Sequence, residues 1–159
     1  MQLVELTVNG LSRQVAASPE ETLLEVLRRE FQAFSVREAC GIGICGACTV
    51  LVDGHTVSSC LVLAGFADGM AVETVEGLGG LDDLHPVQQA FVDETAFQCS
   101  YCTPGFVLAT KALLDEQPHP DPDTIRHELA GNLCRCGSYQ NILAAVQTAA
   151  ERLAGAEGP

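Results

Sequence analysis

Eight cysteines in the chain fall into two sets of four, and clustered thiolates are typical ligands of zinc and of iron–sulfur clusters. The first set has the pattern C-x4-C-x2-C-x11-C and consists of Cys40, Cys45, Cys48 and Cys60. The second set has the pattern C-x2-C-x31-C-x-C and consists of Cys99, Cys102, Cys134 and Cys136. The even count also permits disulfides, but the close spacing and an N-terminus unlike a secretory signal favour metal binding in a reducing compartment.

The first three cysteines have the spacing of plant-type 2Fe–2S proteins. Between them, Gly41, Gly43 and Gly46 let the backbone approach the sulfurs and offer N–H donors to them. The same glycines spell G-x-G-x-x-G, a pattern of dinucleotide-binding turns. That alternative needs a helix after the third glycine, whereas the following ACTVLV predicts a strand. We therefore interpret residues 40–48 as a cluster-binding loop.

The second set is less distinctive in its spacing. Each of its two pairs lies just before a predicted helix, one opening at Pro104 and one at Ser138. Helix N-termini present free N–H groups and the positive end of the helix dipole, so they would stabilise an anionic cluster. From spacing alone, a structural zinc ion held by four thiolates fits this set as well as iron does, although it fits the first set poorly. A Rieske centre is excluded because no histidine lies within either set.

The elements that position the first set are predicted as strands and one helix. Residues 2–17 alternate around Asn9-Gly10, which is a strong signal for a β-hairpin. An amphipathic helix follows, and its sequence SPEETLLEVLRREF predicts Ser18 as the N-cap. A second hairpin around Asp53-Gly54 would bring Cys60 back to the cluster loop.

The pattern changes to a period of 3.6 beyond a stretch rich in glycine and acidic residues. Four helices are predicted there, with residues 86–97 forming the first and Asp123 capping the third. The chain is therefore expected to have an α+β fold. Its expected parts are a β-rich domain over residues 1–76, a linker over residues 77–84 and a helical domain over residues 85–159.

Composition excludes two classes of partner. The formal net charge is −13 and the Lys and Arg residues are scattered, so the chain has no basic surface for nucleic acid or an anionic membrane. No stretch approaches the ~20 apolar residues of a membrane-spanning helix, so direct membrane insertion is not expected. A mean hydropathy of +0.20 indicates a folded globular protein, and we expect a cytoplasmic location.

The sequence also resembles one family, from residue 2 to about residue 153. The resemblance rests on CGIGICGACTVLVDG, the spacing to Cys60, FQCSYCTPGF, and GNLCRCGSY followed by NILAAV. These residues are similar to the iron–sulfur subunits of molybdenum hydroxylases, the group of xanthine dehydrogenase, aldehyde oxidoreductase and carbon monoxide dehydrogenase. The resemblance implies a β-grasp domain of the plant-ferredoxin type, which holds one 2Fe–2S cluster on the first set of cysteines. It also implies a four-helix-bundle domain that holds a second 2Fe–2S cluster on the second set.

The resemblance further implies an electron-transfer subunit of a heterotrimeric enzyme. Electrons would pass singly from a molybdenum centre on a large partner subunit, through both clusters, to a medium FAD subunit or a cytochrome. The molybdopterin, in its cytosine dinucleotide form, would lie near Gln98 and Cys136. Many members have C-R-C-T-G-Y where this chain has CRCGSY, a variant similar to that of some members that oxidise aldehydes and N-heterocycles.

No nucleophile–base pair is found in the sequence, so we expect no catalytic chemistry in this chain alone. One alternative is a stand-alone ferredoxin-like electron carrier or redox sensor. Another is an interaction module stabilised by zinc, which would apply if the chain binds no iron.

Overall fold

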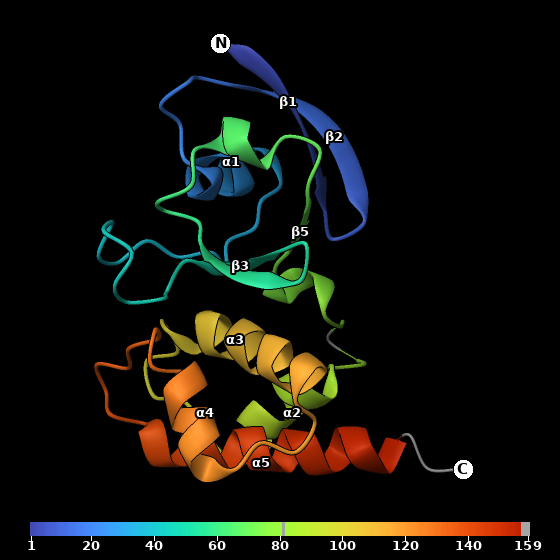
Figure 1. Ribbon diagram of the computed structural model, residues 1–159, viewed down its shortest axis with the longest axis vertical. Helices are drawn as coiled ribbons and strands as arrows, with labels where there is room; N and C mark the ends of the chain where they lie inside the picture. Colours follow the sequence, from blue (N-terminus) through green and yellow to red (C-terminus); the bar gives the residue numbers. More distant parts are fainter. Residues whose placement is uncertain (81, 157–159) are drawn as a thin grey trace.

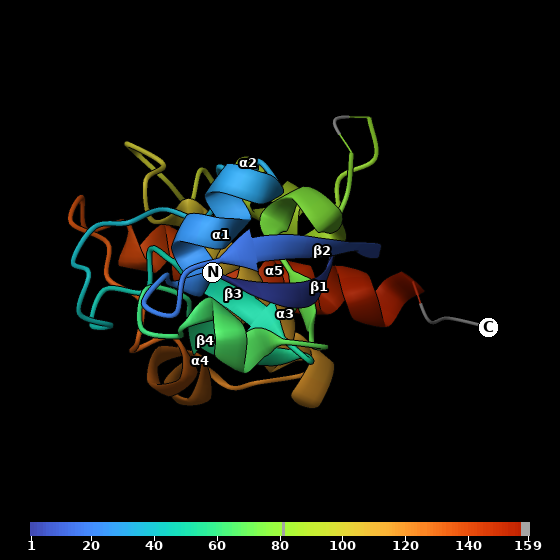
Figure 2. The ribbon, with the colours of Figure 1, turned by 90° about the horizontal axis from the view of Figure 1, so that it is seen from above.

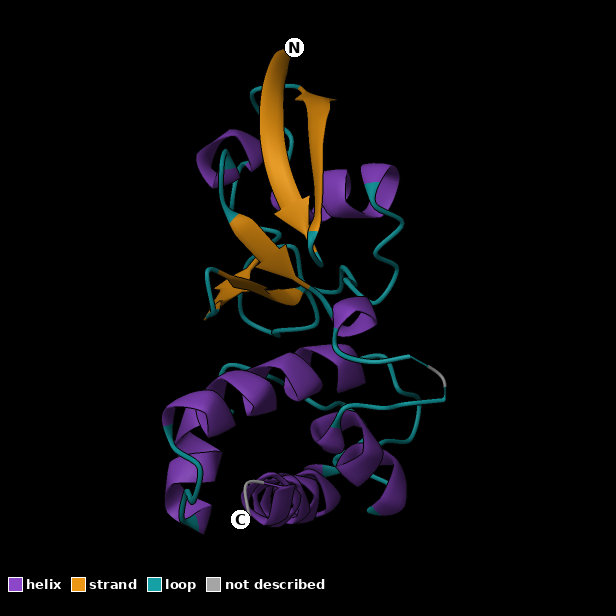
Figure 3. Cartoon of the chain, turned by 90° about the vertical axis from the view of Figure 1, so that its right-hand side faces the viewer, coloured by secondary structure: helices purple, strands orange, loops and turns teal. Residues whose placement is uncertain are grey.

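The structure is a computed structural model that describes residues 1–80 and 82–156, and it has a β-rich half and a helical half (Figure 1). Leu81, within the expected linker, and residues 157–159, at the end of the expected helical domain, lie outside the described residues. Figure 3 shows all strands in one half and α2, α3, α4 and α5 in the other. Within the described part of the chain, no helix is long and apolar enough to cross a membrane.

The β-rich half is built on one mixed sheet of five strands. The strands are β1 (Gln2–Val8), β2 (Leu11–Ala17), β3 (Thr49–Val52), β4 (His55–Ser58) and β5 (Ala71–Glu73). Their order is β2-β1-β5-β3-β4, in which β1 and β5 run parallel and the other neighbours run antiparallel. Both predicted hairpins are confirmed: Asn9 and Gly10 have φ of 50° and 79°, and Asp53 and Gly54 have φ of 48° and 83°. Two successive positive φ angles are the mark of the turns that match the twist of paired strands.

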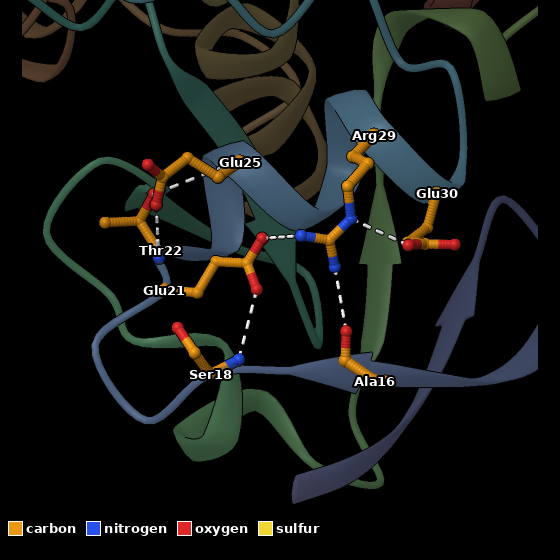
Figure 4. Close-up of polar contacts among 7 residues, drawn as sticks. All are labelled: Ala16, Ser18, Glu21, Thr22, Glu25, Arg29 and Glu30. Atoms are coloured by element: carbon orange, nitrogen blue, oxygen red, sulfur yellow. Dashed lines mark hydrogen bonds and ion pairs between the residues drawn. The ribbon is translucent and has the colours of Figure 1, made fainter. Parts of the chain in front are cut away.

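Helix α1 (Leu23–Glu30) buries its apolar face under this sheet. Its N-cap is Thr22 and not the predicted Ser18 (Figure 4). Thr22 Oγ1 accepts from the N–H of Glu25 at 3.3 Å, and the Glu25 carboxylate accepts from the N–H of Thr22 at 2.7 Å. This reciprocal pair is a capping box.

One half of the predicted S-x-x-E capping pair forms, the bond to the Glu21 carboxylate, but it closes a turn ahead of the helix. Ser18 donates its N–H to the Glu21 carboxylate at 3.2 Å, and Glu21 donates its own to Ser18 O at 3.1 Å. The helix cannot begin there, because Leu23 donates its N–H to Val62 O at 2.7 Å and the backbone of Thr22 is extended at this contact. Arg29 then ties the start of the helix to the sheet, since it contacts both Glu21 and Ala16 O (Figure 4).

The second half contains the four predicted helices, which follow two short 3-10 helices, η1 (Ala64–Ala67) and η2 (Val75–Gly77). The four are α2 (Pro86–Asp93), α3 (Thr103–Glu116), α4 (Pro122–Glu128) and α5 (Tyr139–Ala156). Helix α3 lies between the two halves, with β3 and β4 on one side and the other helices on the opposite side (Figure 1). Each half has its own apolar core, with Leu6, Leu23 and Leu27 in one and Phe91, Phe106 and Ile125 in the other.

Two further helix ends differ from the prediction, in addition to the start of α1. Helix α2 ends at Asp93 and not at residue 97, because Thr95 has a φ of +49° and Ala96 donates its N–H back to Phe91 O at 2.9 Å. Helix α4 is capped by Asp121 and not by Asp123. The Asp121 carboxylate accepts from the N–H groups of residues 123 and 124, which places the expected cap inside the first turn.

Candidate metal centres

The first set of cysteines meets where the loop of residues 40–48 faces the segment after β4. The thiol of Cys45 donates to Cys40, and the thiol of Cys60 donates to Cys48. The charge of Cys40 also acts on Cys60, so the two pairs lie at one site. The fold thus brings the fourth cysteine back to the loop through the β3–β4 hairpin, as the sequence predicts.

Backbone N–H groups of the loop point at this site. The predicted loop glycines, Gly41, Gly43 and Gly46, have φ of 64°, 75° and 69°, a region that favours glycine. The turns they form let the N–H of Ile42 donate to Cys40 Sγ at 3.5 Å. This contact, the Cys45 thiol and the N–H of Ile44 lower the pKa of Cys40 to about 6. The loop therefore stabilises negative charge on sulfur, as an anionic cluster requires.

Cys60 differs from Cys40 in its surroundings. Burial, together with the hydrogen bond to Cys48, raises the pKa of the Cys60 thiol to about 11. The raised pKa means that the Cys60 thiol keeps its proton when no metal is bound. A metal ligand must be a thiolate, so a metal centre would take the place of this proton. Ligation of a metal by Cys60 would therefore require the release of this proton.

The second set meets where α3 and α5 begin. Cys102 is the N-cap residue of α3, and Cys134 lies five positions before Tyr139, the first residue of α5. The thiol of Cys136 contacts Cys99, and the thiol of Cys102 contacts Cys134. This site too therefore holds two pairs of thiols, and each pair joins the two converging segments. Seen from above, residues 131–138 and the loop of residues 40–48 lie on the same side of the molecule, opposite the C-terminal end of α5 (Figure 2).

Helix ends supply the N–H donors of the second site. The N–H of Tyr101, together with the thiol of Cys136, lowers the pKa of Cys99. Burial acts to raise the pKa of Cys134, but contacts from Ser138 and Cys102 outweigh it and lower that pKa; the Ser138 N–H lies 3.4 Å from the sulfur. Burial, followed by the hydrogen bond to Cys134, raises the pKa of Cys102 to about 12. The second site thus resembles the first, because N–H donors lower the pKa of some thiols while burial raises the pKa of another.

The thiols of each site are arranged in two pairs. Among residues 1–80 and 82–156, no three Cys, His, Asp or Glu side chains are placed to hold one metal ion. A 2Fe–2S core instead carries four cysteines, two on each of two irons. Two sites of two pairs, each with N–H donors directed at sulfur, match the ligand set of a 2Fe–2S cluster.

Gln98 lies at the exposed edge of the second site. Its Nε2 donates to the carbonyl oxygen of Cys136 at 3.4 Å, and both residues are exposed. The predicted pair is thus brought together on the surface, where a partner can reach it. Its contact with a pterin stays a prediction.

The two sites are joined by contacts that the sequence did not indicate. Leu133 donates its N–H to Cys45 O at 2.9 Å, and the hydroxyl of Tyr101 donates to Glu38 O at 2.6 Å. Arg37 lies over the Tyr101 ring, 5.2 Å from its centroid, and donates to Ser100 O. These residues flank the cysteines within one to three positions, and that proximity is the only signal of their role in the sequence.

A cavity of about 360 Å³ lies between the two sites. Its lining includes Cys45 from the first site and Cys102 and Cys134 from the second, with Tyr101 and Leu133 between them. The two sets of thiols are thus neighbours across the boundary of the two halves.

Two protein families match the chain, one in each half. Residues 6–74 match the 2Fe-2S iron-sulfur cluster binding domain, and residues 74–147 match the [2Fe-2S] binding domain. One subunit of the nicotinate dehydrogenase of Pseudomonas putida is 47% identical over 93% of this chain and 94% of its own length. The nicotinate dehydrogenase small FeS subunit of Eubacterium barkeri is 44% identical over 95% of this chain and 96% of its own. The chain belongs to the iron–sulfur subunits of the molybdenum hydroxylase family.

Solved structures give the same result for the fold of this iron–sulfur subunit. Quinoline 2-oxidoreductase from Pseudomonas putida superposes with a TM-score of 0.92 at 36% identity, over 99% of this chain and 98% of that chain. The aldehyde oxidoreductase of Desulfovibrio desulfuricans superposes with a TM-score of 0.94 at 42% identity, over 98% of this subunit. The iron–sulfur subunit spans only 17% of that longer chain.

The family confirms the predicted α+β fold, with a ferredoxin-like domain followed by a helical 2Fe–2S domain. It also confirms the predicted class of function. The iron–sulfur subunit binds 2Fe–2S clusters and serves electron transfer in an oxidoreductase. Each cluster accepts one electron at a time, so two clusters in one chain carry electrons in single steps.

Proposed function

We propose that this subunit passes electrons singly from a molybdenum centre on a large partner subunit to an FAD subunit or a cytochrome. The electrons enter at the second site and leave from the first. The observation that carries the proposal is the presence of two separate sites, each with two pairs of thiols, joined by hydrogen bonds within one chain. The proposed ligands are Cys40, Cys45, Cys48 and Cys60 for the first cluster, and Cys99, Cys102, Cys134 and Cys136 for the second.

Each bound 2Fe–2S cluster would supply a one-electron carrier, and the residues of this chain would hold and tune it. The glycine turns of the first loop and the N-termini of α3 and α5 direct N–H groups at the sulfurs, which favours the anionic cluster. At the outer edge of the second site, Gln98 and Cys136 would approach the pterin of the partner. Their exposure and their mutual hydrogen bond support this placement.

The names of the relatives support the proposed substrate class. They are subunits of nicotinate, xanthine and aldehyde oxidoreductases, and one similar structure is a quinoline oxidoreductase. We infer an aldehyde or an N-heterocycle as substrate of the assembled enzyme. The large partner would carry molybdopterin cytosine dinucleotide, and the medium partner would carry FAD. Eight free thiols in the described residues support the expected cytoplasmic, reducing environment.

The proposed division of the chain follows the two cores. One apolar core lies within residues 4–72 and the other within residues 87–150, which supports domains over residues 1–76 and 85–159 with residues 77–84 as the linker. Val75, at the end of the first domain, and Leu78, at the start of the linker, pack against the second core.

Metal analysis and electron paramagnetic resonance of the reduced protein test the proposal. We expect four irons per chain, two for each cluster, and two distinct 2Fe–2S signals that appear in sequence during reduction. Zinc in place of iron, or a single signal, would contradict it. A stand-alone carrier would give both signals but would not co-purify with a molybdenum-containing subunit when the chain is isolated from its natural source.

A further inference from the structure

Asn132 connects the helical half to the loop of the first site. Its side chain is buried, with 7% exposure, and its Nδ2 donates to Gly46 O at 3.0 Å and to Thr49 Oγ1 at 3.3 Å. Gly46 lies inside the loop that carries Cys45 and Cys48, whereas Asn132 precedes Cys134 by two residues. One amide therefore binds the backbone of the first site from a position beside the ligands of the second.

The same place shows direct backbone packing between the halves. A β-carbon on Gly105, near the start of α3, would lie 2.2 Å from Gly46 O and 2.9 Å from Asn132 Nδ2. A β-carbon on Gly46 would lie 2.4 Å from Asn132 Nδ2 and 2.7 Å from Gly131 O. Only glycine fits at both positions without displacing backbone, so the separation of the two halves has little freedom here.

The Asn132 contacts also hold the next residue in place. Leu133 donates its N–H to Cys45 O at 2.9 Å, and Leu133 is directly bonded to Cys134. Cys45 and Cys134 are thus connected by main-chain covalent bonds and a single hydrogen bond.

We infer that Asn132 is a positioning residue that sets the junction between the two cluster sites and so controls electron transfer between them. The inference rests on the proposed function. In the step concerned, one electron would pass from a cluster held by the second set of cysteines to a cluster held by the first set. No bond forms or breaks and no proton moves. The molybdenum centre of the partner subunit supplies the electron, and the flavin or cytochrome acceptor removes it.

The variant Asn132→Ala tests the inference in the full chain with both clusters bound. It removes both amide hydrogen bonds but leaves the contacts of Arg37 and Tyr101 across the boundary, so the two halves stay joined. We expect four irons and both individual 2Fe–2S signals at partial reduction. At full reduction, the magnetic splitting between the two clusters should change, because it depends on their separation and orientation.

A second measurement reports on the stability of the contact between Asn132 and Gly46. Amide hydrogen exchange of residues 129–133 should accelerate about tenfold or more in Asn132→Ala, the factor that corresponds to the loss of a buried hydrogen bond. Asn141→Ala is the matched control, because Asn141 Nδ2 donates to Glu94 O at 2.9 Å within the helical half and away from the junction. The control should leave both the splitting and the exchange unchanged.

Gly105→Ala tests the same junction without removing a hydrogen-bond donor. Its β-carbon should push α3 away from Gly46 and alter the splitting, whereas Gly155→Ala, whose β-carbon meets nothing within 4 Å, should not. Wild-type splitting and exchange in both Asn132→Ala and Gly105→Ala would overturn the inference. Absence of two 2Fe–2S signals in the wild-type protein would instead refute the proposed function, so the two failures are distinguishable.

Discussion

The two cluster sites differ in how the chain supplies N–H donors to sulfur. At the first site the donors come from a nine-residue loop whose positive-φ glycines turn successive N–H groups inward. At the second site they come from the N-terminal ends of α3 and α5, next to two cysteine pairs that 31 residues separate. Both nevertheless lower the pKa of one thiol, Cys40 or Cys99, and raise the pKa of a half-buried thiol, Cys60 or Cys102.

The comparison shows that the electrostatic requirement of a thiolate site does not specify one backbone structure. A loop provides the donors locally, so the first site depends mainly on its own sequence. The second site depends on the packing of α3 against α5, which brings its two pairs together. The sites should therefore respond differently to changes in the helical core.

Removal of one ligand should have the largest effect, and it should be confined to one site. Cys60→Ala leaves Cys48 without its paired thiol, and Cys102→Ala does the same to Cys134. Each variant should retain two of the four irons and lose one of the two paramagnetic signals. Iron analysis and electron paramagnetic resonance of both variants measure this, and loss of both signals from either variant would show that the sites are not independent.

Destabilisation of one apolar core should have the next largest effect. It should release the cluster of the same half and leave the other cluster bound. Phe106 is fully buried in the helical core, and its ring meets Tyr139 edge-on at 6.4 Å; the Tyr139 hydroxyl in turn accepts from the N–H of Cys134 at 2.9 Å. Phe106→Ala should cost about 3–5 kcal/mol and release the second cluster on mild heating.

Leu27→Ala, in the core under the sheet, is the matched variant. It should cost about 2–5 kcal/mol, and the first cluster should be the one released. Thermal release of iron, followed through the two signals, measures both variants. Simultaneous loss of both clusters in each variant would contradict the separation.

Replacement of a glycine at each site should have a smaller effect on the free energy of unfolding. The effect should be larger in the loop of the first site than near the start of α5. Gly46→Ala combines a φ of +69° with contacts below 3 Å, so backbone strain and overpacking should together cost about 2–4 kcal/mol. Gly137→Ala, at the second site, has a φ of +80° but open space around it, so only the strain of about 1–2 kcal/mol should remain. Chemical denaturation of the two variants compares them, and equal costs would argue against tight packing at Gly46.

Mild acid should have the smallest effect and should act on the helical half. His85 is the N-cap of α2, where its Nδ1 accepts from the N–H of Val87 at 3.3 Å. Burial, followed by the charge of Lys111, lowers the pKa of His85 below 6.5, so the folded state favours the neutral ring. The unfolded chain therefore takes up the proton first, and the stabilisation present above pH 6.5 is lost as the pH falls through the folded pKa.

His85→Asn retains a capping side chain without a titratable ring. The wild type should lose more stability than this variant between about pH 7 and about pH 5, a difference measurable by thermal unfolding. If the melting temperature of both proteins falls equally between about pH 7 and about pH 5, His85 makes no contribution to the pH dependence.

Much of the fold follows from local patterns. The Asn9-Gly10 and Asp53-Gly54 turns and the helices after each pair of the second set were all predicted, because turn residues and apolar periodicity act within a few positions. The helix boundaries were predicted less well. Both Ser18 and Thr22 begin an S/T-x-x-E pattern, and only the contact of Leu23 with Val62, 39 residues further along the chain, decides between them.

The sequence by itself determined which residues can bind metal, where the chain turns and which family it resembles, since these depend on residue types and short spacings. The tertiary structure decided how the thiols pair, where Gln98 lies and how the two sites are joined. The contact of Asn132 with Gly46 spans 86 residues, and it forms only because α3 is packed against the sheet. No local sequence pattern predicts such a contact, because it forms only when the two apolar cores pack against each other.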